Sequence, residues 1–181
     1  MLRICISGLT GSGKTTLGEQ LAKDLKVLHV TKELTEGYAA FKKERAALGK
    51  GAALIETATK RYAGGFDREI AELARQNNCV VSTWLGPWTV KNPTLRVWLN
   101  ASFKERARRK ALQKRISEKS AERYVRLKDR STIDSFKKIY GIDVMDHSMF
   151  DIELNTERLS SKERIAIIAL LVAMRGRHKF K

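Results

Sequence analysis

The residues best placed to do chemistry lie between positions 8 and 16, where the sequence reads GLTGSGKTT. Gly8, Gly13, Lys14 and Thr15 match the spacing GxxxxGK[ST], in which a glycine-rich loop turns its backbone N–H groups toward a chain of phosphates. In this pattern the lysine bridges the β- and γ-phosphates as a point charge, and the threonine hydroxyl ligates Mg²⁺. We therefore expect Lys14 to be catalytic and Thr15 to hold Mg²⁺. The candidate residues for binding ATP are Gly8, Leu9, Thr10, Gly11, Ser12, Gly13, Lys14, Thr15 and Thr16.

The segments on either side of this loop have the periodicity that a phosphate site requires. Residues 2–7 form a short apolar run typical of a buried strand, and Leu17, Leu21 and Leu25 follow at helical spacing. A helix that begins near Lys14 directs the positive end of its dipole at the loop. The competing interpretation, a glycine-rich turn that binds nothing, applies mainly where such a strand and helix are missing.

The remaining chain alternates short apolar runs with helical segments. Further strands are expected at residues 26–30, 79–83, 95–100 and 149–155. Short apolar strands alternating with helices indicate a parallel sheet covered on both faces. The predicted fold class is thus α/β, a P-loop three-layer sandwich with a five-stranded parallel sheet and helices on both faces. The length of 181 residues fits one domain.

Several local signals complete the expected fold. Ser102 with Glu105, and Ser160 with Glu163, have capping-box spacing for two helices. Residues 164–174 are apolar enough that we expect the last helix to be buried on several sides. Cys5 and Cys79 lie in apolar runs without metal-ligand spacing, so they are predicted to be buried thiols in a reducing compartment. With no long apolar segment, the expected location is the cytoplasm.

The charge of the chain exceeds what one nucleotide site needs. The formal net charge is +16 and the pI is about 10.1. Residues 104–130 contain twelve basic and four acidic side chains, and the sequence RGRHKFK ends the chain. Clusters of this kind are typical of an electrostatic surface for nucleic acid, so nonspecific RNA binding is one hypothesis, and a solvated basic helix is the other.

The P-loop alone does not distinguish GTPases, motor ATPases and kinases. The chain contains no NKxD-like run for reading guanine. It has helices between the second and third expected strands and a basic helical stretch before the fifth. This order resembles the nucleoside monophosphate kinases, in which helices cover the acceptor and an arginine-rich lid covers the donor.

The C-terminal part resembles a narrower family. The stretch KKIYGIDVMDHSMFDIELNT at residues 137–156 resembles the corresponding run of the archaeal-type cytidylate kinases. FDREIAELA, CVVSTWLGPW and NPTLRVWLNASFKERARR occupy corresponding places upstream, so the resemblance covers nearly the whole chain.

This resemblance implies transfer of phosphate from ATP, with Mg²⁺, to CMP or dCMP by a cytoplasmic, monomeric enzyme whose partners are small nucleotides and no membrane. It implies a single P-loop kinase domain over residues 1–181, with an acceptor-binding helical insertion at about 35–76 and a lid at about 115–137. Asp67 and Arg68 match acceptor residues of the family. Trp84 ends a strand where a base could stack. The lid cations expected to close over the γ-phosphate, as catalytic residues, are Arg126, Lys128 and Arg130.

The chain also departs from the family pattern. Ser82, Thr83 and Trp84 stand where the family has EGR, whose arginine grips the acceptor phosphate, and Ile133 and Ser135 stand where cations are expected. These changes affect the choice of base more than the kinase chemistry. An RNA- or ribosome-associated P-loop ATPase of the same fold is the alternative function, and transfer to a small alcohol such as shikimate is disfavoured by the YGID run.

Overall fold

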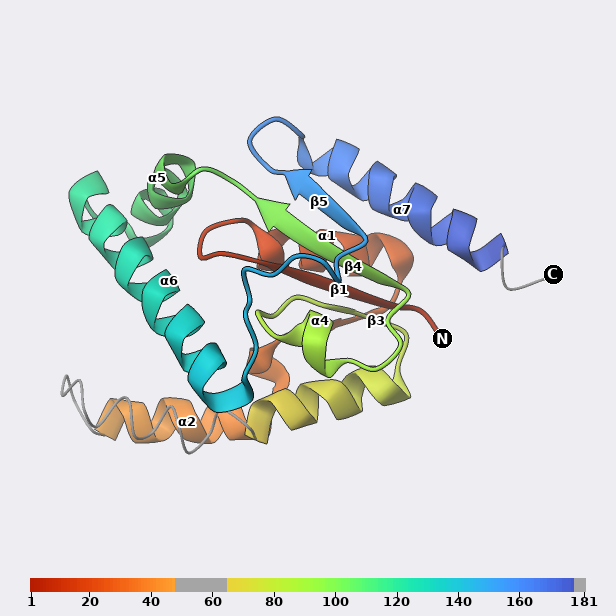
Figure 1. The fold of residues 1–181 in the computed structure, drawn as a ribbon, viewed down its shortest axis with the longest axis horizontal. Helices are drawn as coiled ribbons and strands as arrows, with labels where there is room; N and C mark the ends of the chain where they lie inside the picture. The colour runs from red at the N-terminus through yellow and green to blue at the C-terminus, as the bar shows by residue number, and fades with distance from the viewer. Residues whose placement is uncertain (48–64, 178–181) are drawn as a thin grey trace.

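A five-stranded parallel sheet forms the centre of the molecule, in the order β2-β3-β1-β4-β5 (Figure 1). The computed structural model describes residues 1–47 and 65–177. Its strands are β1 (Arg3–Gly8), β2 (Leu28–Val30), β3 (Cys79–Val81), β4 (Leu95–Asn100) and β5 (Ile152–Asn155). The predicted α/β class and each predicted strand are confirmed, although β2, β3 and β5 are shorter than the apolar runs that predicted them.

Helices cover both faces of the sheet and bury a core on each. On one face, α1 (Lys14–Leu25) and α7 (Ser161–Arg177) pack on β1 and β4, with Leu17, Leu21 and Ile168 fully buried. On the other face, a helix over residues 65–76 places Ile70 and Ala74 against the strands. Cys5 and Cys79 are buried free thiols in this second core, as predicted.

The last helix, α7, is less buried than its composition predicts. Ile168 is fully buried, but Leu170 is 62% exposed and Met174 is 52% exposed. The expectation of burial on several sides is therefore wrong. The physical reason is position: α7 covers the edge of the sheet beside α1 (Figure 1), so only one side of the helix has a neighbour to pack against.

Two helical segments project from the sheet on the side of the P-loop. The first contains a short 3₁₀ helix, η1 (Lys32–Leu34), α2 (Glu36–Ala47) and the helix over residues 65–76. The glycines of GKG at 49–51 and GG at 64–65 predict breaks that divide residues 35–76 into about three helices. Residues 48–64 lie outside the described part of the chain, and Gly65 begins the helix over residues 65–76. The second segment is a hairpin of α5 (Phe103–Lys114) and α6 (Glu118–Tyr140), between which Arg115 turns the chain in a left-handed conformation.

The predicted helix caps form, with one difference. Ser160 and Glu163 make the full reciprocal capping box at the start of α7. At α5, Ser102 accepts the Glu105 N–H, but the Ser102 N–H donates to Glu157 instead. Glu105 is unable to complete the box because it pairs with Arg108 and Arg109. A short helix, α4 (Gly86–Thr89), follows β3. None of the helices in the described part of the chain combines the length and apolar character needed to cross a bilayer.

Candidate active site

The P-loop connects β1 to α1 and packs directly on α5. Gly11 has a φ of 83°, and a Cβ built on it would lie 2.7 Å from the backbone oxygen of Arg106, so only glycine fits there. Gly13, with a φ of 98°, is the N-cap of α1 and offers no side-chain oxygen to its N–H groups. The first N–H groups of α1 therefore keep their hydrogen-bonding capacity for an anion.

Lys14, the first residue of α1, folds back over the P-loop. Its Nζ donates to the carbonyl oxygens of Gly8 at 2.5 Å and Leu9 at 2.9 Å, and lies 4.9 Å from the centroid of the Trp84 ring. Burial lowers the pKa of Lys14 to about 7; the Asp129 carboxylate opposes this shift, and the nearby cations Lys110, Arg106 and Lys32 add to it. Binding of an anionic phosphate would raise the pKa of Lys14 again, because the negative charge stabilises the ammonium form.

Two arginines of α5, three residues apart, reach the P-loop. Arg106 Nη1 donates to the Thr10 carbonyl at 3.0 Å and to Asp129 Oδ2 at 2.5 Å, and Asp129 Oδ1 accepts the Thr10 N–H at 3.0 Å. Arg106, Asp129 and Thr10 are all at least nine-tenths buried. The middle of α6 is thereby attached to the P-loop both directly and through Arg106 of α5.

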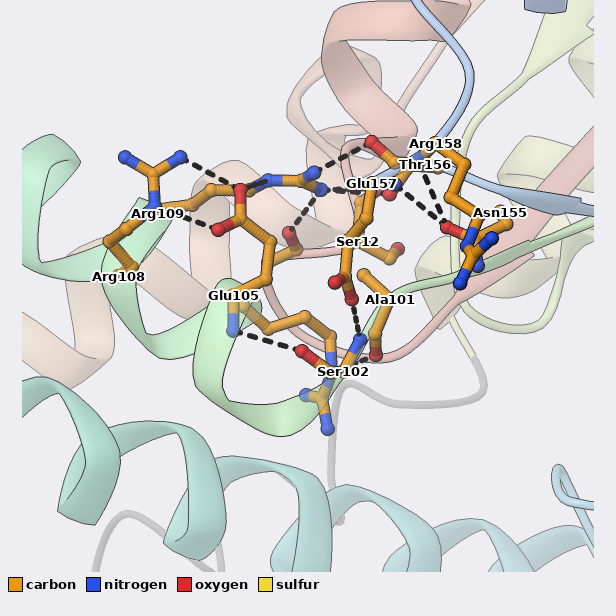
Figure 2. Close-up of polar contacts among 12 residues, drawn as sticks. Ser12, Ala101, Ser102, Glu105, Arg108, Arg109, Asn155, Thr156, Glu157 and Arg158 are labelled. Atoms are coloured by element: carbon orange, nitrogen blue, oxygen red, sulfur yellow. Dashed lines mark hydrogen bonds and ion pairs between the residues drawn. The ribbon is translucent and has the colours of Figure 1, made fainter.

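Arg109 attaches the P-loop to the loop after β5. Figure 2 shows its guanidinium extended between Glu105 and Thr156. Nη1 donates to Thr156 Oγ1 and Nη2 to the Thr156 carbonyl, each at 2.8 Å, and Nη1 also lies 3.4 Å from the Gly11 carbonyl. A flat cationic group therefore lies where the P-loop, α5 and the loop after β5 meet.

The predicted lid cations project from α6 and make contacts away from the P-loop. The Arg126 guanidinium carbon lies 4.9 Å from the Phe103 ring centroid, and Arg130 is 3.9 Å from Asp134 with an 82% exposed side chain. Lys128 is also exposed. In the described arrangement the cations that act on Lys14 are Arg106, Lys110 and Lys32, so the catalytic roles of Arg126, Lys128 and Arg130 stay predictions.

On the acceptor side, the structure brings Asp67 together with the end of α6. The Tyr140 hydroxyl donates to Asp67 Oδ2 at 2.6 Å. Burial raises the pKa of Asp67 to about 6, and the hydrogen bond from Tyr140 opposes this shift. Arg68 is exposed on the next position of the same helix.

Trp84 lies between the P-loop and α6. One face receives the Lys14 ammonium, and the ring meets Phe136 edge to face at a centroid distance of 6.1 Å. Trp88, which is partly buried, packs on Phe150 with a ring-centroid distance of 5.3 Å. Ser82, where the family has the acidic residue of EGR, is bonded through Oγ to His29 Nε2 at 2.7 Å.

Sequence reasoning missed several residues of this site: Lys32, Arg106, Arg109, Lys110, Asp129 and Tyr140. The spacing of Arg106, Arg109 and Lys110 puts them on one face of a helix, which was an available signal. An acidic residue within the basic run, Asp129, was another.

Comparison with known proteins identifies the family. A sequence model described as "Cytidylate kinase-like family" matches residues 3–158. The chain belongs to this family. It is 33% identical over 174 residues to a cytidylate kinase from Pyrococcus horikoshii, covering 92% of this chain and 86% of that protein. A cytidylate kinase from Sulfurisphaera tokodaii is 33% identical over 178 residues, with 91% of this chain and 92% of the relative covered.

Solved structures with the same fold are more distant in sequence. An uncharacterized protein from Eubacterium ventriosum superposes with a TM-score of 0.70 at 13% identity, covering 96% of this chain and 99% of the other. A deoxyadenosine kinase from M. mycoides gives 0.59 at 16% identity over 96% of this chain and all of its own. The family confirms the resemblance predicted from residues 137–156 and, with it, the enzyme class of a nucleoside monophosphate kinase. The relatives give no support to the RNA- or ribosome-associated ATPase.

Proposed function

We propose that the protein transfers the γ-phosphoryl group of ATP to a pyrimidine nucleoside monophosphate, with CMP and dCMP as the preferred acceptors, giving ADP and CDP or dCDP. The observation that carries this proposal is the family match over residues 3–158, which includes both the P-loop and the acceptor residues. We infer that residues 1–181 act as one kinase domain, with residues 35–76 over the acceptor and residues 115–137 in the lid.

On the donor side, the P-loop residues 8–16 would hold the phosphates of ATP. The N–H groups at the start of α1 are left without a side-chain cap, and Lys14 needs only to rotate away from Gly8 and Leu9 to reach a phosphate. Mg²⁺ would neutralise charge on the β- and γ-oxygens. The exposed hydroxyl of Thr15, in the first turn of α1, fits that ion as one hard oxygen ligand.

In the transfer, an oxygen of the acceptor phosphate forms a bond to the γ-phosphorus while the bond from that phosphorus to the β–γ bridging oxygen breaks. This reaction needs positioning and charge neutralisation more than a protein nucleophile. Lys14 supplies one positive charge. We propose that Arg126, Lys128 and Arg130 supply others. Arg126 lies over the Phe103 ring and Arg130 makes an exposed ion pair with Asp134 on the next turn of α6, contacts that a side-chain rotation can release.

On the acceptor side, we propose that Asp67, Arg68 and Trp84 bind the nucleoside monophosphate. Asp67 and Tyr140 join the acceptor insertion to α6, and Trp84 separates that region from Lys14. A carboxylate is the hydrogen-bond acceptor that suits the exocyclic amino group of cytosine. Asp67 therefore favours CMP over UMP.

The test is an acceptor screen with purified protein, ATP and Mg²⁺. CMP, dCMP, UMP, AMP and GMP are compared for ADP release and, separately, for the diphosphate product. We expect CMP to be the best acceptor, with dCMP and UMP behind it. ADP release without any diphosphate from any monophosphate would refute the proposal and indicate an ATPase.

We further propose that the basic surface of the α5–α6 hairpin contacts RNA without sequence preference, and that the protein is a monomer. The exposed cations Arg115, Lys119 and Arg123 support the RNA contact. Arg175 does not belong to this surface, because it is bonded to the Thr94 carbonyl and Asp151. The rest of the predicted basic tail, the Arg177 side chain and residues 178–181, lies outside the described residues. The two buried free thiols fit a reducing compartment such as the cytoplasm.

A further inference from the structure

Arg106 and Asp129 form a buried ion pair whose partners lie on two different helices, α5 and α6. Their side chains are only 6% and 11% exposed, and Arg106 Nη1 lies 2.5 Å from Asp129 Oδ2. Neither residue belongs to the P-loop. The pair nevertheless binds both polar backbone groups of one P-loop residue: Asp129 accepts the Thr10 N–H at 3.0 Å, and Arg106 donates to the Thr10 carbonyl at 3.0 Å.

We propose that Arg106 and Asp129 are positioning residues that fix the P-loop at Thr10 in the conformation that binds nucleotide phosphates. They do not need to touch ATP to do this. The inference rests on the proposed function only in taking the P-loop as the ATP site, and it does not depend on which acceptor is used.

A buried ion pair contributes little to stability by itself, because the loss of hydration offsets the attraction of the charges. This pair makes more hydrogen bonds than the packing of α5 on α6 requires. Arg106 also donates through Nε to the Ala101 carbonyl at 3.2 Å, and this second hydrogen bond fixes the orientation of the guanidinium that contacts the loop. Gly11 rests on the backbone of Arg106, and a single added carbon there would overlap it. The loop is thus fixed at two adjacent residues by one turn of α5.

Two kinds of variant separate positioning from stability. Asp129→Asn removes the negative charge and leaves the Arg106 charge buried without a counter-charge, so this variant is expected to lower stability as well as function. The double variant Arg106→Met with Asp129→Leu removes both charges and refills the space, which commonly preserves a fold. Arg108→Met is the matched control, because Arg108 is an exposed arginine of the same helix that pairs with Glu105.

The measurements are the dissociation constant of Mg²⁺–ADP by calorimetry, thermal unfolding, and kcat and KM for ATP with the best acceptor. In the folded double variant we expect the dissociation constant to rise about ten- to hundredfold, since each lost hydrogen bond involves a charged group. In the same variant we expect KM for ATP to rise more than kcat falls. Arg108→Met should match the wild type in every measurement.

The proposal is overturned if the double variant, folded and as stable as the wild type, binds ADP with unchanged affinity. It is also overturned if Asp129→Asn loses affinity and the double variant regains it, because the pair would then be structural only. Failure of the proposed function looks different: the wild type would bind ADP normally and phosphorylate no monophosphate.

Discussion

Lys14 should take up a proton when the protein binds a nucleotide. Burial and the neighbouring cations hold the pKa of Lys14 at about 7 in the free protein, well below the ordinary value of 10.5. An adjacent phosphate reverses this shift because it stabilises the ammonium form. At pH 8 only about 0.1 of the free lysine is protonated, so binding should take up about 0.9 proton, whereas at pH 6 the uptake should be only about 0.1.

The assay is calorimetric titration with Mg²⁺–ADP in buffers of different ionisation enthalpy, at pH 6 and pH 8. Lys14→Arg is the matched control, since arginine keeps its charge at both values and takes up no proton at this position. The protonation of ADP itself contributes equally to both proteins. The difference between wild type and Lys14→Arg therefore isolates the lysine.

The sign of the pH effect on affinity follows from the same linkage. Because the bound state holds the extra proton, affinity should fall by about tenfold for each pH unit above 7 and be nearly constant below it. Equal proton uptake at pH 6 and pH 8, or the same uptake in Lys14→Arg, would refute the reasoning about Lys14.

Three further predictions concern catalysis by Lys14, the acceptor side and the basic hairpin. Lys14→Ala should abolish phosphoryl transfer with little change in thermal unfolding, because the lysine neutralises transition-state charge; wild-type ADP release by the purified variant would exclude this role. Burial raises the pKa of Asp67 to about 6 from its ordinary value of 3.8, so the folded protein binds this proton more tightly than the unfolded chain does. The Asp67 contribution to the free energy of unfolding should therefore fall by about 2 kcal/mol as pH rises from 4 to 6, and the Asp67→Asn variant, compared with the wild type by urea unfolding, should lack that slope. Changing the hairpin cations to glutamine should reduce the slope of log K for RNA binding against log salt concentration by about 0.7 to 0.9 per lost contact, without altering turnover. If the wild type does not bind a structured RNA at low salt, the excess charge is only a solubility feature. The residues changed are Arg115, Lys119 and Arg123.

The parts of the fold that were predicted correctly depend on local sequence. The strands are short apolar runs, and the three central ones, β1, β3 and β4, are buried on both faces of the sheet, so composition identifies them. The P-loop is specified by nine consecutive residues. The exposure of Leu170 and Met174 was not predicted, because an apolar helix at the edge of a sheet has the same composition as a buried one. Burial there depends on which neighbours the fold provides.

The unpredicted parts of the site depend on contacts between distant residues. Thr10 and Asp129 are 119 positions apart, and Asp67 and Tyr140 are 73 apart. No periodicity links such pairs, because the contact exists only after the hairpin and the acceptor insertion have packed around the sheet. The signal for Asp129 was an acidic side chain within a basic helix, which by itself is equally typical of an ion pair with solvent-exposed neighbours.

Helix α6 is one continuous helix that contacts both the P-loop side and the acceptor side of the site. Asp129 contacts the P-loop from its middle, and Tyr140 contacts Asp67 of the acceptor insertion from its last residue. These two positions are eleven residues apart, about 16 Å along a helix. A tilt of α6 that frees one contact displaces the other, so occupancy of the donor site and occupancy of the acceptor site should be thermodynamically linked, each substrate changing the affinity for the other by the same factor.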